Sequence, residues 1–207
     1  IAAELELKMR QFDIKTAFLY GEINEEIYIE QPPGFEKGNK VCRLNKSLYG
    51  LKQAPRAWNT RFTNTLKDFD LAQSDADPCV YYNINDLLIV ALYVDDGLVL
   101  ARSQTTLDAF LERLSSEYQV KSHKPDMFLG IAIHSNTPGI ISIEQSMYCK
   151  KVLEKFNLFE STPSKIPADT NVRLQSAGEA DKVSFPYREA IGCLMYLTVC
   201  SRPDIAY

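Results

Sequence analysis

Two adjacent aspartates interrupt an apolar stretch of the sequence, LIVALYVDDGLVLA at residues 88–101. Asp96 is followed by Gly97, and Asp-Gly between apolar runs is a strong signal for a tight β-hairpin turn in which glycine takes a positive φ. The same hairpin would project the carboxylates of Asp95 and Asp96 from a rigid sheet, and Mg²⁺ prefers such hard oxygen ligands. The pair is therefore either a turn alone or one part of a metal site.

A metal site of this kind needs a further carboxylate, and Asp13 is the candidate. It lies near the end of a strand expected over residues 5–14, within QFDIKTAFLYG. Taken alone, an aspartate at a strand end is expected to cap the following turn. Together with the aspartate pair and a basic stretch nearby, it would supply the further carboxylate that a site for two metal ions needs.

A basic segment lies between Asp13 and the aspartate pair. Residues 40–61 hold six basic side chains and no acidic one, although the whole chain carries a formal net charge of −4. Such a cluster can neutralise the phosphates of a nucleic acid. The alternative is the solvated face of a helix that begins at Pro55. The basic residues are Lys40, Arg43, Lys46, Lys52, Arg56 and Arg61.

The order of the expected elements favours an α+β fold class over a doubly wound sheet, because hairpins alternate with helices. One helix face is expected to comprise Trp58, Phe62, Leu66 and Phe69, with Trp58 in the core. Ser103 is the expected N-cap of a helix that reaches Tyr118. Further strands are expected over 26–31, on both sides of the aspartate pair, over 127–134 and over 140–144; further helices over 148–156 and 185–200; and a linker over 161–184.

The composition is that of an ordinary globular chain, with 207 residues of which 45% are hydrophobic and 24% charged. The five cysteines are odd in number and include no C-x-x-C pair, so they indicate neither a disulfide nor a zinc framework and favour a reducing compartment. The longest apolar run, residues 87–94, is too short to span a bilayer, and no membrane partner is expected.

Several separated segments resemble the reverse transcriptase of copia-type LTR retrotransposons, in the order of that family. They are FDIKTAFLYGEINEEIYIEQPPGF, LNKSLYGLKQAPRAW, LYVDDGLVL, MFLGIAI, YREAIGCLMYL and SRPDIAY. The combination of Y-V-D-D with S-L-Y-G-L-K-Q-A-P-R is specific, whereas Y-V-D-D alone is not. The resemblance covers almost the whole chain. It implies a right-hand polymerase palm whose antiparallel sheet is backed by helices, with partial fingers and the start of a thumb or connection.

The resemblance also implies RNA-directed DNA synthesis with two Mg²⁺ ions, for which Mn²⁺ can substitute. By position, Asp13, Asp95 and Asp96 match the catalytic, metal-binding aspartates of the family. The primer 3′-hydroxyl would attack the α-phosphorus of a dNTP and pyrophosphate would leave, with catalysis supplied by positioning and charge neutralisation. Lys121 is matched to a lysine that assists the departure of pyrophosphate.

Residues that bind the nucleotide and the nucleic acid are likewise implied by the resemblance. The nucleotide-binding set is Phe18, Tyr49, Gly50 and Tyr93. Phe18 matches an aromatic beneath the incoming sugar, although a ring at this position also packs readily in a core. Retroviral relatives carry glutamine in place of Tyr49, so no hydrogen-bond role is transferred to it. The nucleic-acid-binding set is Lys52, Arg56 and Arg61, with Phe128, Leu129 and Gly130 in a segment that grips the primer or is simply a buried strand.

The same resemblance predicts a palm with partial fingers over 1–135 and a thumb- or connection-like segment over 136–207. Its partners would be an RNA or DNA template with a primer, dNTPs, and the RNase H, integrase and protease of one polyprotein. The expected location is cytoplasmic, in virus-like particles, with nuclear entry of the product. Little of the fingers precedes Asp13, so this chain alone is expected to be a weak or inactive polymerase. The alternative is a truncated or domesticated remnant that only binds nucleic acid or protein.

Overall fold

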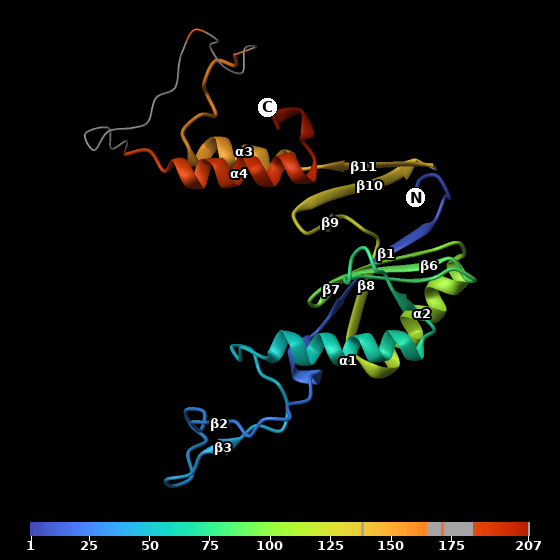
Figure 1. Ribbon diagram of the computed structural model, residues 1–207, viewed down its shortest axis with the longest axis vertical. Coiled ribbons are helices and arrows are strands. Elements are labelled where there is room, and N and C mark those ends of the chain that lie inside the picture. Colours follow the sequence, from blue (N-terminus) through green and yellow to red (C-terminus); the bar gives the residue numbers. More distant parts are fainter. Residues whose placement is uncertain (138, 165–170, 172–183, 207) are drawn as a thin grey trace. The chain divides into compact units, whose positions relative to one another are not determined.

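The computed structural model describes residues 1–137, 139–164, 171 and 184–206 (Figure 1). It contains two compact units: the first comprises Ile1–Phe128 and Ser135–Ile141, and the second comprises Leu129–His134 and Ser142–Tyr207. The division predicted between residues 135 and 136 falls inside strand β10 (Ile131–Thr137). The assignment of palm and thumb to these segments stays a prediction. The linker predicted over 161–184 lies largely outside the described residues.

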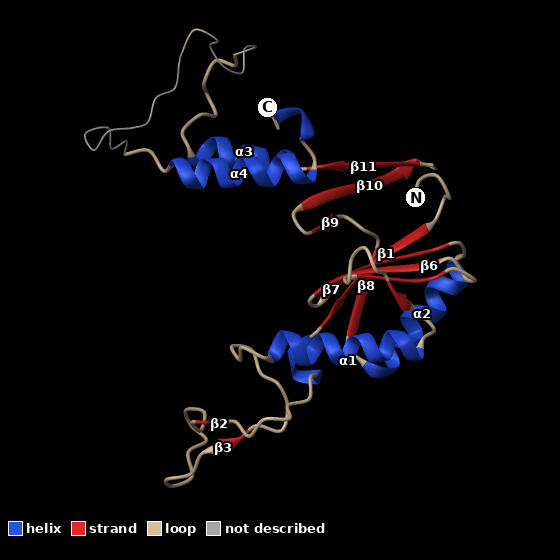
Figure 2. Ribbon diagram, in the orientation of Figure 1, coloured by secondary structure: helices blue, strands red, loops and turns tan. Residues whose placement is uncertain are grey.

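The first unit is built on a six-stranded antiparallel sheet with the strand order β4-β5-β6-β7-β1-β8. Figure 2 draws the strands in red. The strands are β1 (Lys8–Ile14), β4 (Ala72–Gln73), β5 (Val80–Asn83), β6 (Leu88–Tyr93), β7 (Asp96–Ala101) and β8 (Val120–His123). Strand β1 pairs with β7 on one side and with β8 on the other. The strand that carries the first predicted aspartate is therefore hydrogen-bonded directly to the strand that follows the aspartate pair.

Two helices pack against this sheet, α1 (Ala54–Asp68) and α2 (Gln104–Glu117). Helix α1 has Pro55 in its first turn, as predicted. It buries the predicted apolar face, which comprises Trp58, Phe62, Leu66 and, at the C-cap, Phe69. The amide of Thr106 donates to the Ser103 hydroxyl over 3.0 Å, which confirms Ser103 as the N-cap of α2.

Alternating burial gives the sheet two different faces. Phe12, Val90 and Val99 are fully buried and join residues of α1 and α2 in one core cluster. Figure 1 shows both helices on this side of the sheet. Asp13 and Asp96 occupy the alternate positions along β1 and β7, so their side chains point to the opposite face. We call this second face the carboxylate face.

The second unit contains the two helices predicted near the end of the chain, α3 (Ser146–Lys155) and α4 (Tyr187–Cys200). A separate sheet has the order β11-β10-β9, with β9 at Met127–Phe128 and β11 at Ile140–Glu144. The single strand predicted over 127–134 is interrupted at Leu129 and Gly130. Their φ values of 52° and 77° turn the backbone between β9 and β10.

The remaining described elements are short: β2 (Tyr28–Ile29), β3 (Cys42–Arg43) and the 3-10 helices η1 (Ala17–Tyr20) and η2 (Pro203–Ile205). The described chain is thus a mixed α and β structure with antiparallel sheets and four α-helices, in agreement with the predicted α+β class. Strands β3, β4, β5 and β8 were not predicted, because segments of two to four residues are too short to show a period. Within the described ranges, no helix is long and apolar enough to cross a membrane.

Candidate metal and nucleotide site

Four side chains form a row across the carboxylate face, one from each of four neighbouring strands. The register pairs Tyr93 of β6 with Asp96 of β7, and Asp96 with Asp13 of β1. On the other side of β1, Asp13 is paired with Lys121 of β8. Residues directly opposed in antiparallel strands share a face and have Cβ atoms about 5 Å apart. Two of the predicted catalytic aspartates and a lysine therefore meet at one place, although distant parts of the sequence supply them.

The third aspartate lies in the turn between β6 and β7. This turn consists of Val94 and Asp95, because Tyr93 and Asp96 already form the last cross-strand pair. Val94 has a φ of 58°, whereas the φ of Asp95 is not positive, and this is the φ pattern of a type II′ turn. The tight hairpin predicted for V-D-D-G is confirmed, with Val94 and Asp95 as its turn residues. The placement of the turn at Asp96 and Gly97 is wrong, since both residues belong to β7.

Gly97 has a steric role instead of a turn role. A Cβ atom at this position would lie 2.1 Å from Cζ of Phe12, its cross-strand partner in β1. Glycine thus leaves room for the Phe12 ring to cross the β7 backbone. Next to this contact, the Ile14 amide donates to the Asp95 carbonyl over 2.9 Å. Strands β1 and β7 are therefore joined closely right up to the aspartate turn.

Negative charges repel one another at this edge of the sheet. Burial, followed by the charges of Asp95 and Asp13, raises the pKa of Asp96 above its ordinary value of 3.8. His123 of β8 acts in the opposite direction. Its register partner is Gln11, which lies two residues before Asp13 and on the same face. The raised pKa of Asp96 shows that the three carboxylates share one local field, which a bound cation would relieve.

A divalent cation fits the chemistry of these side chains. Carboxylate oxygens are hard ligands, and Mg²⁺ is commonly held by one or two carboxylates together with substrate phosphates. Among residues 1–137, 139–164, 171 and 184–206, no three His, Cys, Asp or Glu side chains form a group that could hold a metal ion by themselves. The binding of a metal ion by Asp13, Asp95 and Asp96 stays a prediction.

Two of the predicted nucleotide-binding aromatics contact each other beside the aspartates. The rings of Phe18, in η1, and Tyr49 have centroids 4.7 Å apart. Phe18 is partly buried against the core cluster, whereas half of Tyr49 is exposed. Burial, followed by the charge of Asp95, raises the pKa of Tyr49, and a hydrogen bond with the Phe18 backbone opposes the rise. Gly50 follows with a φ of 95° and open space at its Cβ position.

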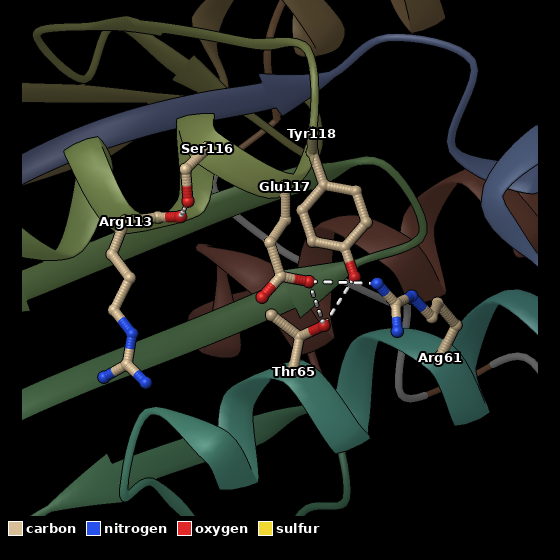
Figure 3. A network of polar contacts seen from close by, with 6 residues as sticks. All are labelled: Arg61, Thr65, Arg113, Ser116, Glu117 and Tyr118. Atoms are coloured by element: carbon tan, nitrogen blue, oxygen red, sulfur yellow. Dashed lines mark hydrogen bonds and ion pairs between the residues drawn. The ribbon is translucent and has the colours of Figure 1, made fainter.

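The predicted nucleic-acid-binding cations lie on α1 or just before it. Lys52 and Arg56 are exposed. Arg61 donates to Oε2 of Glu117 over 3.0 Å, and the Thr65 hydroxyl donates to the same oxygen over 3.2 Å (Figure 3). Arg61 thus belongs to a polar network that joins α1 to the end of α2. A phosphate contact by Arg61 stays a prediction, and it would have to share or replace this ion pair.

The residues predicted to grip the primer are divided between the two units. Phe128 ends β9 in the first unit, whereas Leu129 and Gly130 form the following turn in the second unit. Within the second unit, the Tyr196 hydroxyl of α4 donates to the Leu129 carbonyl over 2.7 Å. The role of these residues at a primer stays a prediction.

Two features of this site depend on strand register and were not identified from the sequence. Gln11 lies on the carboxylate face and is 7% exposed, and its Nε2 donates to the Met127 carbonyl over 2.9 Å. An isolated glutamine in a strand carries no local signal for such a contact. The adjacency of Lys121 and Asp13 likewise follows from the pairing of β1 with β8, a strand that the sequence pattern did not reveal.

Similarity to known proteins extends over the whole chain. The family model described as reverse transcriptase (RNA-dependent DNA polymerase) matches residues 1–170. The retrovirus-related Pol polyprotein from transposon TNT 1-94 of Nicotiana tabacum is 40% identical, over 100% of this chain and 17% of the polyprotein. The corresponding polyprotein from transposon RE1 of Arabidopsis thaliana is 34% identical, over 100% of this chain and 14% of the polyprotein.

A shorter relative is the putative transposon Ty5-1 protein of Saccharomyces cerevisiae. It is 32% identical, over 94% of this chain and 66% of its own length. The chain therefore spans less than a fifth of either plant polyprotein but about two thirds of the yeast protein.

Proposed function

Because the chain belongs to the reverse transcriptase family, and to the Pol polyproteins of LTR retrotransposons, we propose that it forms the catalytic palm of a copia-type element. The reaction is the RNA-directed addition of dNTPs to a primer 3′-hydroxyl. The observation that carries the proposal is the register of the carboxylate face, which pairs Asp13 with Asp96 on one side and with Lys121 on the other. Asp95 lies in the adjoining turn.

Each of these side chains has a role that its place in the row or in the adjoining turn supports. Asp13 and Asp95 would hold two Mg²⁺ ions, or Mn²⁺ ions in their place, with Asp96 in support. When bound, such ions neutralise phosphate charge and lower the pKa of a coordinated hydroxyl. Lys121 lies opposite Asp13 and would donate a proton to the departing pyrophosphate.

The aromatic residues beside the aspartates would select and orient the nucleotide. The Phe18 ring would lie beneath the sugar, where it would clash with a ribose 2′-hydroxyl. Tyr49 supports the Phe18 ring through the 4.7 Å contact. Gly50 has open space at its Cβ position, which allows a ligand to approach its backbone closely. Tyr93 is 58% exposed next to Asp96 and would contact the end of the nucleic acid.

The nucleic acid and the rest of the polyprotein are the proposed partners. Lys52 and Arg56, both exposed, would contact phosphates of the template or primer, together with Arg61. The turn formed by Leu129 and Gly130, with Phe128 before it, would grip the primer. RNase H, integrase and protease would come from the same polyprotein. The site of action would be the cytoplasm, in virus-like particles.

Primer extension tests this function directly. The assay uses a labelled DNA primer on an RNA template with dNTPs and Mg²⁺, and it compares the chain with its Asp95→Asn variant. We expect extension to fall by at least about 100-fold in the variant, since a metal ligand is lost. Asp86→Asn is the matched control, because it removes the same charge from an exposed residue of the loop between β5 and β6. It should extend primers as the parent does.

Two results would contradict the proposal. Equal extension by the parent and the Asp95→Asn variant would place the active carboxylate elsewhere. No extension by the parent, in this chain and in a longer segment of its polyprotein, would favour a remnant that only binds nucleic acid or protein. Retention of a primer–template duplex by the inactive chain would then separate nucleic-acid binding from protein binding.

Sugar selection by Phe18 has its own test. Phe18→Val removes the ring and should raise the use of ribonucleotides relative to dNTPs by at least about tenfold, because a pocket that no longer excludes a hydroxyl discriminates poorly. The measurement is the ratio of kcat/KM for a ribonucleotide and the matching dNTP. An unchanged ratio in an active variant would mean that Phe18 serves only the core.

A further inference from the structure

A hydrogen bond joins helix α1 to the aspartate turn. Nε1 of Trp58 donates to the backbone carbonyl of Val94 over 2.6 Å, although the two residues are 36 positions apart in the sequence. Trp58 is 2% exposed, and Val94 is the residue directly before Asp95. This tryptophan was predicted as a core residue, and the core packing is confirmed. In addition to this packing, the Trp58 indole makes a polar contact with the aspartate turn.

The turn that receives this hydrogen bond has a strained backbone. Val94 has a φ of 58°, which is a true outlier for a β-branched residue, because its Cβ substituents crowd the backbone in the left-handed region. Such strain persists only where the surrounding structure enforces it. An isolated hairpin with valine at this position would therefore relax toward another turn conformation.

The indole of Trp58, which donates this hydrogen bond, is held more firmly than the Val94 carbonyl that accepts it. The indole of Trp58 is packed among three other rings, with centroid distances of 5.1 Å to Phe62, 5.4 Å to Tyr118 and 6.2 Å to Tyr20. The Tyr118 hydroxyl is bonded in turn to the Thr65 hydroxyl over 2.6 Å (Figure 3). A rigid aromatic cluster thus presents one N–H group to a turn that would otherwise be free to change its conformation.

The two peptide groups that flank Asp95 are both fixed by hydrogen bonds from outside the turn. The carbonyl before Asp95 belongs to Val94 and accepts from Trp58. The carbonyl after it belongs to Asp95 itself and accepts from the amide of Ile14 in β1, over 2.9 Å. Because each bond fixes the orientation of one peptide plane, the pair of bonds fixes the backbone dihedrals of Asp95 and hence the direction of its Cα–Cβ bond.

We propose that Trp58 is a positioning residue for the aspartate turn: its indole N–H holds the Val94 carbonyl and thereby fixes the backbone from which the Asp95 carboxylate projects. The effect on catalysis rests on the proposed function, whereas the effect on the turn does not. Trp58 touches no reacting atom in this scheme and acts through the backbone of Val94.

Trp58→Phe is the informative variant, because it keeps an aromatic ring in the cluster and removes only the N–H donor and part of the ring. Phe62→Leu is the matched control, since it loosens the same cluster without removing the hydrogen bond. Each variant is compared with the parent at the same number of degrees below its own thermal unfolding midpoint, so that a general loss of stability does not affect the comparison.

The first readout is amide hydrogen exchange at Ile14, whose N–H group donates a hydrogen bond to the Asp95 carbonyl. We expect exchange in the Trp58→Phe variant to be faster by about tenfold, the factor expected when a buried carbonyl loses its partner. In Phe62→Leu, exchange at Ile14 should match that of the parent. Equal protection at Ile14 in all three proteins would overturn the proposal.

The second readout is steady-state primer extension in Mg²⁺. Trp58→Phe should lower kcat by about tenfold and leave the KM for dNTP nearly unchanged, because a misplaced carboxylate affects the chemical step more than nucleotide binding. Phe62→Leu should leave both constants near those of the parent. A kcat in Trp58→Phe equal to that in Phe62→Leu would overturn the catalytic part of the proposal.

The two readouts separate this inference from the proposed function. If neither the parent chain nor a longer segment of its polyprotein extends a primer, but Ile14 exchange still responds to Trp58→Phe alone, then the turn is positioned as inferred and the polymerase proposal fails. If extension depends on Asp95 but neither readout responds to Trp58→Phe, then the polymerase proposal stands and the role of Trp58 is structural only.

Discussion

The two units of the chain bury their apolar side chains to very different extents. In the first unit, Phe12, Phe62 and Leu66 are completely buried in a continuous cluster that spans the sheet, α1 and α2. In the second unit, helix α3 has no buried residue in the described chain, and Leu197 is the buried residue of α4. Val199 of α4 is 82% exposed. The unit that carries the aspartates therefore stabilises itself, whereas the helices of the other unit bury little of their apolar surface.

This difference matters for the site, because charged side chains brought close together are costly. Burial and like charges raise the pKa of Asp96, and Val94 holds a strained φ. Both effects oppose folding, and both are tolerated only where the surrounding packing is strong enough to offset them. The densely packed first unit supplies that packing directly beneath the carboxylate face.

The largest effect should come from truncating the core of the first unit. Phe62→Ala is expected to lower the free energy of unfolding by about 3–5 kcal/mol, since it leaves a cavity among the rings of Trp58 and Tyr118. The chain has one tryptophan, Trp58, so urea unfolding followed by tryptophan fluorescence reports on the first unit. Leu194→Ala is the counterpart in α4, where Leu194 is 44% exposed, and it should leave this transition unchanged. A shift of equal size in both variants would show that the units unfold as one body.

A pair of glycine substitutions gives a smaller effect of opposite sign in the two units. Gly97→Ala should destabilise the first unit by about 1–3 kcal/mol, because its Cβ would overlap the ring of Phe12. Gly192→Ala should stabilise α4 by up to about 1 kcal/mol, because no heavy atom of the described chain outside the adjacent helix backbone lies within 4 Å of the added Cβ, and alanine is the better helix former.

The two glycine variants need separate measurements. Tryptophan fluorescence follows Gly97→Ala, and the helical signal in far-ultraviolet circular dichroism follows Gly192→Ala. A stable Gly97→Ala protein would mean that Phe12 can leave its place over the β7 backbone, and the close apposition of β1 and β7 at the site would then be in doubt.

The smallest effect concerns pH and the carboxylate face. The pKa of Asp96 is raised in the folded state, so the native protein binds this proton more tightly than the unfolded chain does. The resulting loss in the free energy of unfolding is absent when the pH is below the ordinary pKa of 3.8, and it grows as the pH rises through the folded-state pKa. Asp96→Asn should therefore increase the free energy of unfolding at pH 7 and have little effect at pH 3.

Urea unfolding at the two pH values checks this difference, with Asp86→Asn as the control for net charge. If Asp96→Asn increased the free energy of unfolding equally at both pH values, charge repulsion at the site would not be the cause of the increase. In the parent, added Mg²⁺ should raise the midpoint at pH 7 by binding the same carboxylates, and it should do so less in Asp96→Asn.

The comparison between units also shows which parts of the fold were predictable. The helices were predicted well, because the spacing of Trp58, Phe62 and Leu66 and the cap at Ser103 are local patterns over a few residues. The three aspartates were found by their types and their order along the chain. The turn was misplaced by two residues, because Asp-Gly is statistically typical of a tight turn while the need for space around Phe12 decided the real position of Gly97.

The amino-acid sequence, read alone, was enough to predict the helices, the longer strands and the family, and to single out the three aspartates as candidates. Which strands pair, and in which register, was decided only by the folded molecule, since pairing depends on packing between segments that are far apart in the chain. That register brings Lys121 to Asp13, and the approach of α1 brings Trp58 to Val94. No local pattern contains either contact, because each exists only when the sheet and its covering helices pack together.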